Sequence, residues 1–115
     1  MWMIDPRIMC DKHLLGEHGE LHKFLKSWEK QVSIQGRIQN NSIEPISYKS
    51  RHDLLAREMV LRGMNHQSPI EQPDFSYLPP DHLNYKVDTR ESRKLLVTRC
   101  QRCRARAYEL WDQKP

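Results

Sequence analysis

The apolar residues between positions 11 and 34 recur at helical spacing, and this pattern constrains the fold more than any other feature of the chain. The line consists of Leu14, Leu21, Leu25, Trp28 and Val32. Side chains three, four or seven positions apart share one face of a helix, and an apolar face of this kind must be buried. We therefore expect a helix from about residue 11 or 12 to residue 34, with Asp11 as its N-cap and Gly36 beyond its end.

Capping signals and a glycine indicate two further helices. Ser50-x-x-Asp53 resembles a capping box, and the helix that it opens is expected to end at Gly63, after about three turns. Asp88-x-x-Glu91 has a similar form. It begins a third helix, which we expect to extend to residue 110 or 111.

The segments between these helices carry loop signals. Residues 36–47 are polar, and residues 64–88 hold four prolines without a sustained period. Three aromatic residues are expected to fasten the second loop across the helices: Phe75, Tyr77 and Tyr85. The sequence has no strand alternation and no internal repeat. We therefore expect residues 1–115 to form one all-α domain, with three helices around one small core and long irregular connections.

Positive charge is concentrated in the last part of the sequence. The chain has 19 Lys and Arg against 15 Asp and Glu, and residues 89–115 contribute 8 of the cations but only 3 of the anions. Six arginines account for most of this excess: Arg90, Arg93, Arg99, Arg102, Arg104 and Arg106. Because Arg binds phosphate in a bidentate manner, a nucleic acid is the expected partner. The alternative is a solvated basic helix face.

Cys10, Cys100 and Cys103 make an odd count, which argues against a disulfide framework and fits a reducing compartment. Cys100-x-x-Cys103 could form half of a zinc site, but no second pair of cysteines and no closely spaced pair of histidines completes it. Both thiols also fit the seam of a helix that packs inward: Leu96, Cys100, Cys103, Ala107 and Leu110. We therefore expect the thiols in the core, and neither a metal nor another cofactor.

The sequence lacks membrane and export signals. No apolar run is long enough to span a membrane, and the first residues lack the charged flank and apolar stretch of a secretion signal. We expect a cytoplasmic protein without membrane association.

His13, Glu17 and Glu20 fall on one stripe of the first predicted helix, beside its apolar face. Burial and neighbouring charges move pKa values at the edge of a core, so such a trio can be held in the unequal protonation states that acid-base chemistry needs. The alternative is a solvated helix face on which side chains four positions apart stabilise the helix by pairing with one another. The spacing alone favours this second interpretation.

Four blocks of sequence form an ordered pattern. The first and most specific is DKHLLGEHGEL at residues 11–21, and the others lie at residues 51–54, 62–66 and 99–104. In this order they resemble the pyrimidine-dimer DNA glycosylase family, the phage-type endonuclease V group. The resemblance implies a small all-α DNA-repair enzyme. Such an enzyme cuts the glycosidic bond at a cyclobutane pyrimidine dimer in double-stranded DNA and then nicks the strand at the abasic site.

The resemblance also implies a mechanism. In this family the α-amino group at the mature N-terminus attacks the deoxyribose C1′ and forms an imine, and β-elimination then breaks the 3′ phosphate bond. An α-amine suits this step because its ordinary pKa is about 8, whereas that of Lys is about 10. Glu20 aligns with the catalytic Glu, which stabilises the cationic intermediate and moves protons. His13 aligns with a residue at the DNA site, and Lys23 with a phosphate contact.

The sequence departs from the family's pattern at three places. The family begins Met-Thr-Arg and loses its Met, whereas this chain begins Met1-Trp2, and a bulky second residue normally prevents that loss. Either Met1 supplies the amine, or the chain starts a few residues upstream. Gly19 stands where the best-known member has an Arg that contacts DNA. Residues 107–111 are not followed by that member's longer aromatic and basic tail.

The predicted catalytic groups are therefore Glu20 and the amine of Met1. The other predicted site residues are DNA contacts at His13, Lys23, Arg99, Arg102 and Arg106, and supporting residues at Glu17 and His66. We expect a monomer that acts on damaged double-stranded DNA in the cytoplasm of a bacterial or phage-infected cell, at the nucleoid. Two alternative functions belong to other classes of protein: a noncatalytic DNA-binding protein that uses the Arg-rich third helix, and a Cys/His metal protein.

Overall fold

The chain is mainly helical. A computed structural model describes residues 1–65 and 69–112, with side chains described as far as residue 110. Its elements are the 3-10 helices η1 (Pro6–Ile8) and η2 (Pro45–Ser47) and the α-helices α1 (Asp11–Glu29), α2 (Gln35–Gln39), α3 (Tyr48–Leu61), α4 (Pro80–Leu83), α5 (Thr89–Arg99) and α6 (Gln101–Asp112). These described ranges contain no strand, and the predicted all-α class is confirmed. Among their helices, none has both the length and the apolar character needed to cross a membrane.

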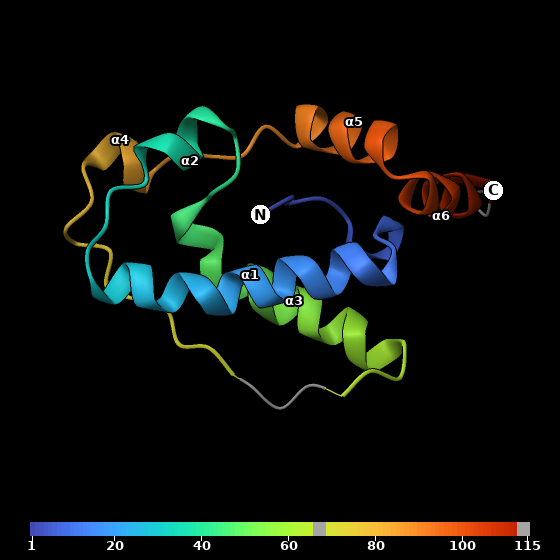
Figure 1. Cartoon of the computed structure of the whole chain (residues 1–115), viewed down its shortest axis with the longest axis horizontal. Helices are drawn as coiled ribbons and strands as arrows, with labels where there is room; N and C mark the ends of the chain where they lie inside the picture. Colours follow the sequence, from blue (N-terminus) through green and yellow to red (C-terminus); the bar gives the residue numbers. More distant parts are fainter. Residues whose placement is uncertain (66–68, 113–115) are drawn as a thin grey trace.

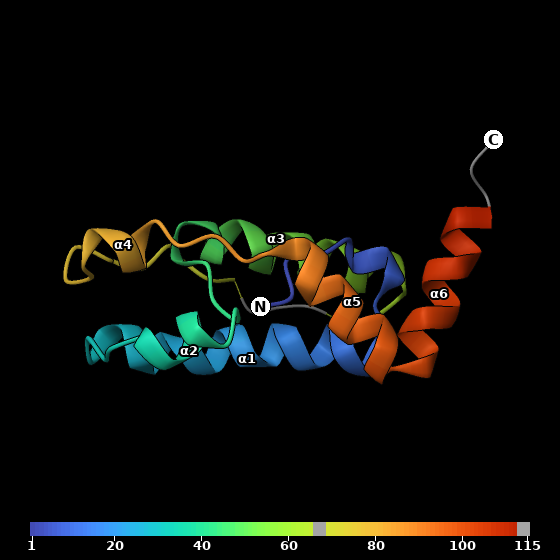
Figure 2. The same cartoon turned by 90° about the horizontal axis from the view of Figure 1, so that it is seen from above.

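The helices form two layers with the N-terminal segment, residues 1–9, between them. α1 and α3 pack side by side in one layer (Figures 1 and 2). α2 and α5 lie on the other side of the N-terminal segment (Figure 1). α6 packs against η1 and α5 and projects away from the other helices at one end (Figure 2). Because of this arrangement the first residues of the chain lie inside the fold, and Met1 is only 5% exposed.

A cluster of aromatic rings joins α1, α3 and the loop that follows α3. The ring of Trp28 lies 5.8 Å from that of Tyr48 and 4.8 Å from that of Phe75, both edge to face. The Tyr48 hydroxyl donates to the main-chain carbonyl of Leu21, and burial raises the pKa of Tyr48 to about 12. These rings form one end of the hydrophobic core.

The long loop is fastened by its aromatic residues, as predicted. Phe75 enters the aromatic cluster. The Tyr77 hydroxyl donates to the Val32 carbonyl at 3.0 Å, and the Tyr85 hydroxyl donates to Asn41 Oδ1 at 2.8 Å. The two segments predicted to be loops also hold the short helices α2 and α4.

Three helices end in the same way, with one residue in the left-handed backbone region. These residues are Gln31 after α1 (φ 55°), Asn41 after α2 (φ 53°) and Gly63 after α3 (φ 82°). After α1, for example, the Gln31 N–H donates to Trp28 and the Val32 N–H to Ser27, which satisfies the last carbonyls. The predicted end at Gly63 is confirmed. The predicted extension of the first helix to residue 34 is wrong, because Gln31 adopts a conformation that glycine usually signals.

Two predicted N-caps are also wrong. Asp11 is the first residue of α1 rather than its cap, a position that Cys10 takes. Ser50 does not open the second helix, because α3 begins at Tyr48, directly after the turn of η2. The Ser50 hydroxyl instead donates to the Ser47 carbonyl within the first turn.

The Arg-rich segment forms two helices rather than the single one predicted. Asp88 caps α5 as predicted, and its carboxylate accepts hydrogen bonds from the N–H groups two and three residues further on, each at 3.1 Å. Cys100 then takes an extended conformation (φ −117°, ψ 109°) and separates α5 from α6. The predicted helical seam is therefore interrupted at Cys100, although Leu96 and Cys103 are fully buried on either side of it.

A buried ion pair joins α1, α3 and the N-terminal segment. The side chains of Glu17 and Arg51 are 1% and 2% exposed. Arg51 donates to the two carboxylate oxygens of Glu17 at 2.6 and 2.9 Å, and to the Ile4 carbonyl at 2.6 Å. The Trp2 N–H donates to Glu17 Oε1 at 3.1 Å. Since a buried charge is tolerated only when it is paired in this way, the pair fixes the N-terminal segment against both helices.

Replacing Arg51 tests this role. Arg51→Met should lower the free energy of unfolding by about 3–5 kcal/mol, because it leaves the Glu17 carboxylate buried without its cation. Urea unfolding, followed by tryptophan fluorescence and circular dichroism, measures the loss. Lys49→Met is the matched control on α3: its ion pair with Asp53 is exposed, so the free energy of unfolding should hardly change. Equal stability of the two variants would contradict the role given to Arg51.

Candidate active site

The amino group of Met1 meets the carboxylate of Glu20 on α1. The Met1 nitrogen lies 3.2 Å from Glu20 Oε1 and donates to the Ser42 main-chain carbonyl at 2.9 Å. The Met1 side chain is fully buried, whereas 44% of the Glu20 side chain is exposed. The apolar side chain thus anchors Met1, while its amine lies beside a carboxylate that solvent and ligands can reach. An amine and a carboxylate in this arrangement can act as nucleophile and proton-transfer group.

Two carboxylates on α1 hold the first two residues of the chain. Glu20 binds the amine of Met1, and Glu17, one turn earlier, accepts from the N–H of Trp2. On the other side, the Ser92 hydroxyl of α5 donates to the Trp2 carbonyl at 2.6 Å. The next residue, Met3, has a φ of 57°, a conformation that costs about 1–3 kcal/mol in residues other than glycine. The surrounding bonds hold this strained backbone and so fix the direction of the amine.

An open cleft of about 740 Å³ lies beside the amine and the carboxylate. Its walls come from the N-terminal segment, α1, the turn after α2 and α5, and its lining includes Met1, Trp2, Glu20, Ser42, Tyr85, Lys94, Leu95 and Thr98. Clefts of this volume bind small molecules, and a single nucleotide is of this size class. The amine of Met1 therefore faces a space in which a nucleotide can be held.

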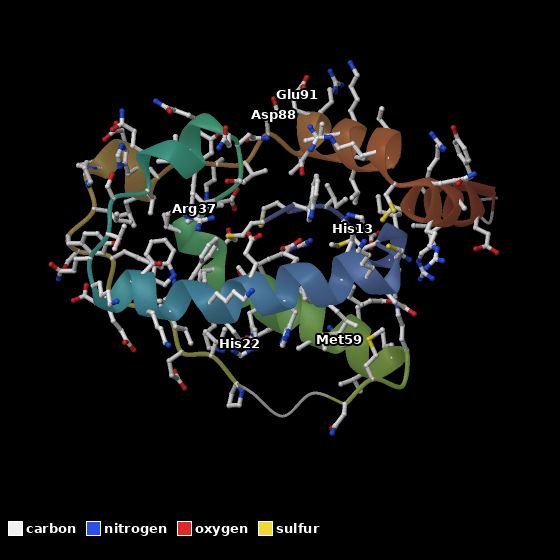
Figure 3. All side chains as sticks on the ribbon, viewed as in Figure 1. His13, His22, Arg37, Met59, Asp88 and Glu91 are labelled. Carbon is white, nitrogen blue, oxygen red and sulfur yellow. The ribbon has the colours of Figure 1, made fainter. Side chains whose placement is uncertain are left out.

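Asn41 ties the two sides of the cleft together. Its side-chain oxygen accepts from the Asp88 N–H at 2.7 Å and from the Tyr85 hydroxyl at 2.8 Å, and its amide nitrogen donates to the Asp88 carbonyl at 3.0 Å. Figure 3 shows Asp88 and Glu91 at the start of α5. The bonds made by Asn41 set the position of α5 relative to the turn that carries Ser42.

Glu20 also lines a second groove. It is lined by Leu15, Gly16, Gly19, Glu20, Lys23, Phe24, Ser27 and Arg37. The Arg37 guanidinium lies over the Phe24 ring, 4.0 Å from its centre, between α2 and α1 (Figure 3). Two cations, Lys23 and Arg37, thus flank the exposed carboxylate. Such cations suit a phosphate backbone that passes beside Glu20.

The structure brings together three of the predicted site residues. Met1, Glu17 and Glu20 lie at one place, and the groove beside Glu20 holds Lys23. The roles given to these residues remain predictions.

The other predicted residues lie elsewhere or outside the described ranges. Arg99 ends α5 while Arg102 and Arg106 belong to α6, and none of the three lines the cleft or the groove. His13 has its Nδ1 3.2 Å from the thiol of Cys10, among the cysteines. His66 lies outside the residues that the structure describes. The DNA contacts predicted for these residues stay predictions.

Four residues of the site were not predicted from the sequence. Arg51 could have been found, because it lies four positions before the buried Leu55 and inside a block that resembles the family. Arg37 and Lys94 are ordinary cations in the sequence, and only the fold places them beside Glu20 and in the cleft. Ser42 contributes a main-chain carbonyl, which no residue type signals.

The pairing of amine and carboxylate beside an open cleft defines a small all-α protein with an enzyme-like site. A family model described as pyrimidine dimer DNA glycosylase matches residues 1–72. The chain therefore belongs to the pyrimidine dimer DNA glycosylase family, a family of DNA repair. The matched part includes Met1, Glu17, Glu20 and Arg51 and ends before α5. No curated protein and no solved structure matches the chain.

Gly19 offers a test of the groove as a DNA contact. A side chain at this position has open space, since a Cβ would meet nothing within 4 Å. Gly19→Arg should raise the affinity for duplex DNA several-fold at low salt, because it adds a cation beside Lys23, and it should steepen the salt dependence by roughly one counterion. Fluorescence anisotropy at several salt concentrations measures both effects.

Gly19→Gln is the control for that substitution. Gln and Arg raise helix propensity over glycine by similar amounts, but Gln adds no positive charge. Gly19→Gln should therefore leave the affinity for DNA unchanged. If both variants bind DNA like the unaltered chain, DNA does not pass along this groove.

Proposed function

We propose that this protein is a bifunctional DNA N-glycosylase and abasic-site lyase that acts on cyclobutane pyrimidine dimers in duplex DNA. The observation that carries the proposal is the 3.2 Å contact between the amine of Met1 and Glu20, at the edge of a cleft of about 740 Å³. Membership of the pyrimidine dimer DNA glycosylase family supports the substrate class. The Arg-rich α5 and α6 support an anionic partner.

The first step is attack by the unprotonated amine of Met1 on the deoxyribose C1′. The nitrogen lone pair forms the new N–C1′ bond, and the glycosidic bond breaks with its electron pair on the departing base, which takes up a proton. The nitrogen gives up one proton, and the sugar ring opens as the C1′–O4′ electron pair moves to O4′, which takes up a proton. The nitrogen and C1′ are then joined as a protonated imine. Glu20 is the group that stabilises this cation and accepts protons, because its carboxylate contacts the amine and is exposed to the cleft.

The second step uses the acidity that the imine gives to the C2′ hydrogen. Glu20 removes this proton, the C2′–C3′ double bond forms, and the 3′ phosphate leaves with the electron pair of the C3′–O bond. Carboxylate and nucleophile must act on neighbouring atoms in this step, and the contact between Glu20 and the amine of Met1 in the free protein supports this assignment.

Access of the target to this site requires that a nucleotide leave the duplex. A pyrimidine dimer weakens its own base pairing, so bending and extrusion at the lesion cost less than in undamaged DNA. The volume of the cleft suits a single nucleotide, and in the proposed complex Lys23 and Arg37, which line the groove beside Glu20, bind phosphates.

Glu20→Gln should abolish strand cleavage while it preserves the fold and DNA affinity. We expect nicking of ultraviolet-irradiated plasmid to fall by at least about 100-fold, because the amide cannot accept the C2′ proton. Glu29→Gln, which neutralises an exposed carboxylate at the end of α1, is the matched control and should cleave normally. Normal nicking by Glu20→Gln would show that another group transfers the proton.

Borohydride trapping identifies the nucleophile. Reduction of the imine should join the chain covalently to abasic DNA, and mass spectrometry of the digested adduct should place the link on the amino terminus. Lys23 and Lys94 are the competing amines, since they line the groove and the cleft. Lys23→Arg and Lys94→Arg should therefore still be trapped. A link on either Lys would contradict the assignment, and the absence of any adduct would favour a noncatalytic DNA-binding protein.

A further inference from the structure

We propose that Cys10, His13, Cys100 and Cys103 bind one structural zinc ion. Their three sulfur atoms and a ring nitrogen of the histidine all lie within 4.8 Å of one another. The ligands come in two pairs with equal spacing, Cys10-x-x-His13 at the start of α1 and Cys100-x-x-Cys103 at the start of α6. Three cysteines and one histidine are a common ligand set of structural zinc.

Three distances between these atoms are close to those of a tetrahedral site. With zinc–sulfur bonds of about 2.3 Å and zinc–nitrogen bonds of about 2.0–2.1 Å, two sulfurs lie about 3.8 Å apart, and sulfur and nitrogen about 3.6 Å apart. The sulfurs of Cys10 and Cys100 are 3.8 Å apart. His13 Nδ1 lies 3.2 Å from the Cys10 sulfur and 3.6 Å from the Cys103 sulfur. The side chains therefore need little movement to surround an ion.

The main chain around the four residues favours thiolates. The Cys10 N–H donates to the Cys103 sulfur at 3.2 Å, and the Cys103 N–H donates to the Cys100 sulfur at 3.4 Å. Cys10 and Cys103 also lie at the N-termini of α1 and α6, where the helix dipole stabilises negative charge. Three thiolates outweigh the charge of Zn²⁺, and neighbouring arginines suit the resulting anionic centre: Arg99, Arg102 and Arg104.

The ion would have a structural role, because four protein ligands leave no open position for a substrate. Cys10 and Cys103 are buried, and the site joins the start of α1 to residues that follow about 90 positions later in the chain. It also gives a reason for the break at Cys100, whose extended backbone separates two helices and whose sulfur faces Cys10. The rings of His13 and Trp2 pack edge to face, so the centre supports the N-terminal segment.

This proposal revises the expectation that the chain needs no metal. The other half of the zinc site is supplied by Cys10 and His13, which lie far from Cys100 and Cys103 in the sequence. One cysteine and one histidine do not form the second cysteine pair, or the histidine pair, by which a zinc site is usually recognised in a sequence. Only the packing of α6 against η1 brings the two pairs together.

A second group of possible ligands supplies the control. Nitrogen atoms of His18, His22 and His52 also lie within 4.8 Å of one another. His13 and His22 lie on different sides of α1 (Figure 3). This group offers three nitrogens and no sulfur, so cobalt bound there would give a different absorption spectrum from cobalt bound by thiolates.

The test is metal analysis of the full chain purified under reducing conditions. We expect inductively coupled plasma mass spectrometry to find about one zinc ion per chain. After exchange with cobalt, we expect the intense visible bands of a tetrahedral ion and a sulfur-to-cobalt charge-transfer band. Cys100→Ser alters the least buried cysteine and should lose most of the zinc, whereas His22→Gln should retain it. Chelation should lower the Tm of the unaltered chain by several degrees.

The proposal is wrong if the unaltered, reduced chain binds neither metal in stoichiometric amount. It is also wrong if bound cobalt lacks the charge-transfer band, or if His22→Gln rather than Cys100→Ser loses the zinc. Because these measurements use the unaltered chain as well as its variants, failure of Cys100→Ser to fold leaves the test intact. The result is independent of the proposed catalysis, since Glu20→Gln should keep its zinc.

Discussion

The site of this protein depends on the buried ion pair between Glu17 and Arg51. Neither side chain reaches solvent, so each charge must be satisfied within the fold. Arg51 also donates to the Ile4 carbonyl, and Glu17 accepts from the Trp2 N–H. The first residues of the chain are thereby bound to α1 and α3 through a charge network. The amine of Met1 lies next to Glu20 because the residue after it is held by Glu17.

Distant parts of the chain complete this arrangement. The family match covers residues 1–72, which hold the amine, the carboxylates and Arg51. α5 follows later and supplies the opposite wall of the cleft, held in place by the bonds of Asn41 to Asp88. The cysteines at the junction of α5 and α6 meet the start of α1 in the same way. In both places short polar contacts position the last helices, which also bury Leu96, Cys103 and Ala107 in the hydrophobic core.

Sequence patterns predicted those features that depend on neighbouring residues. The all-α class, the end of α3 at Gly63, the cap of α5 at Asp88 and the fastening of the long loop by its aromatics are confirmed. The end of α1 was not predictable, because Gln31 takes the left-handed conformation in place of glycine. The break at Cys100 was hidden for a similar reason: its apolar spacing continues through both helices, although the backbone turns between them.

The sequence by itself determined that α1 would carry an apolar face with His13, Glu17 and Glu20 beside it, since helical geometry fixes that relation. Only the tertiary structure decided what each of the three meets. Glu17 is buried against Arg51, Glu20 stays half exposed beside the amine of Met1, and His13 lies among the cysteines. The three side chains of one stripe thus lie in three different environments, because different distant segments of the chain cover successive turns of α1. The burial and the partners of each side chain depend on the segment that covers it.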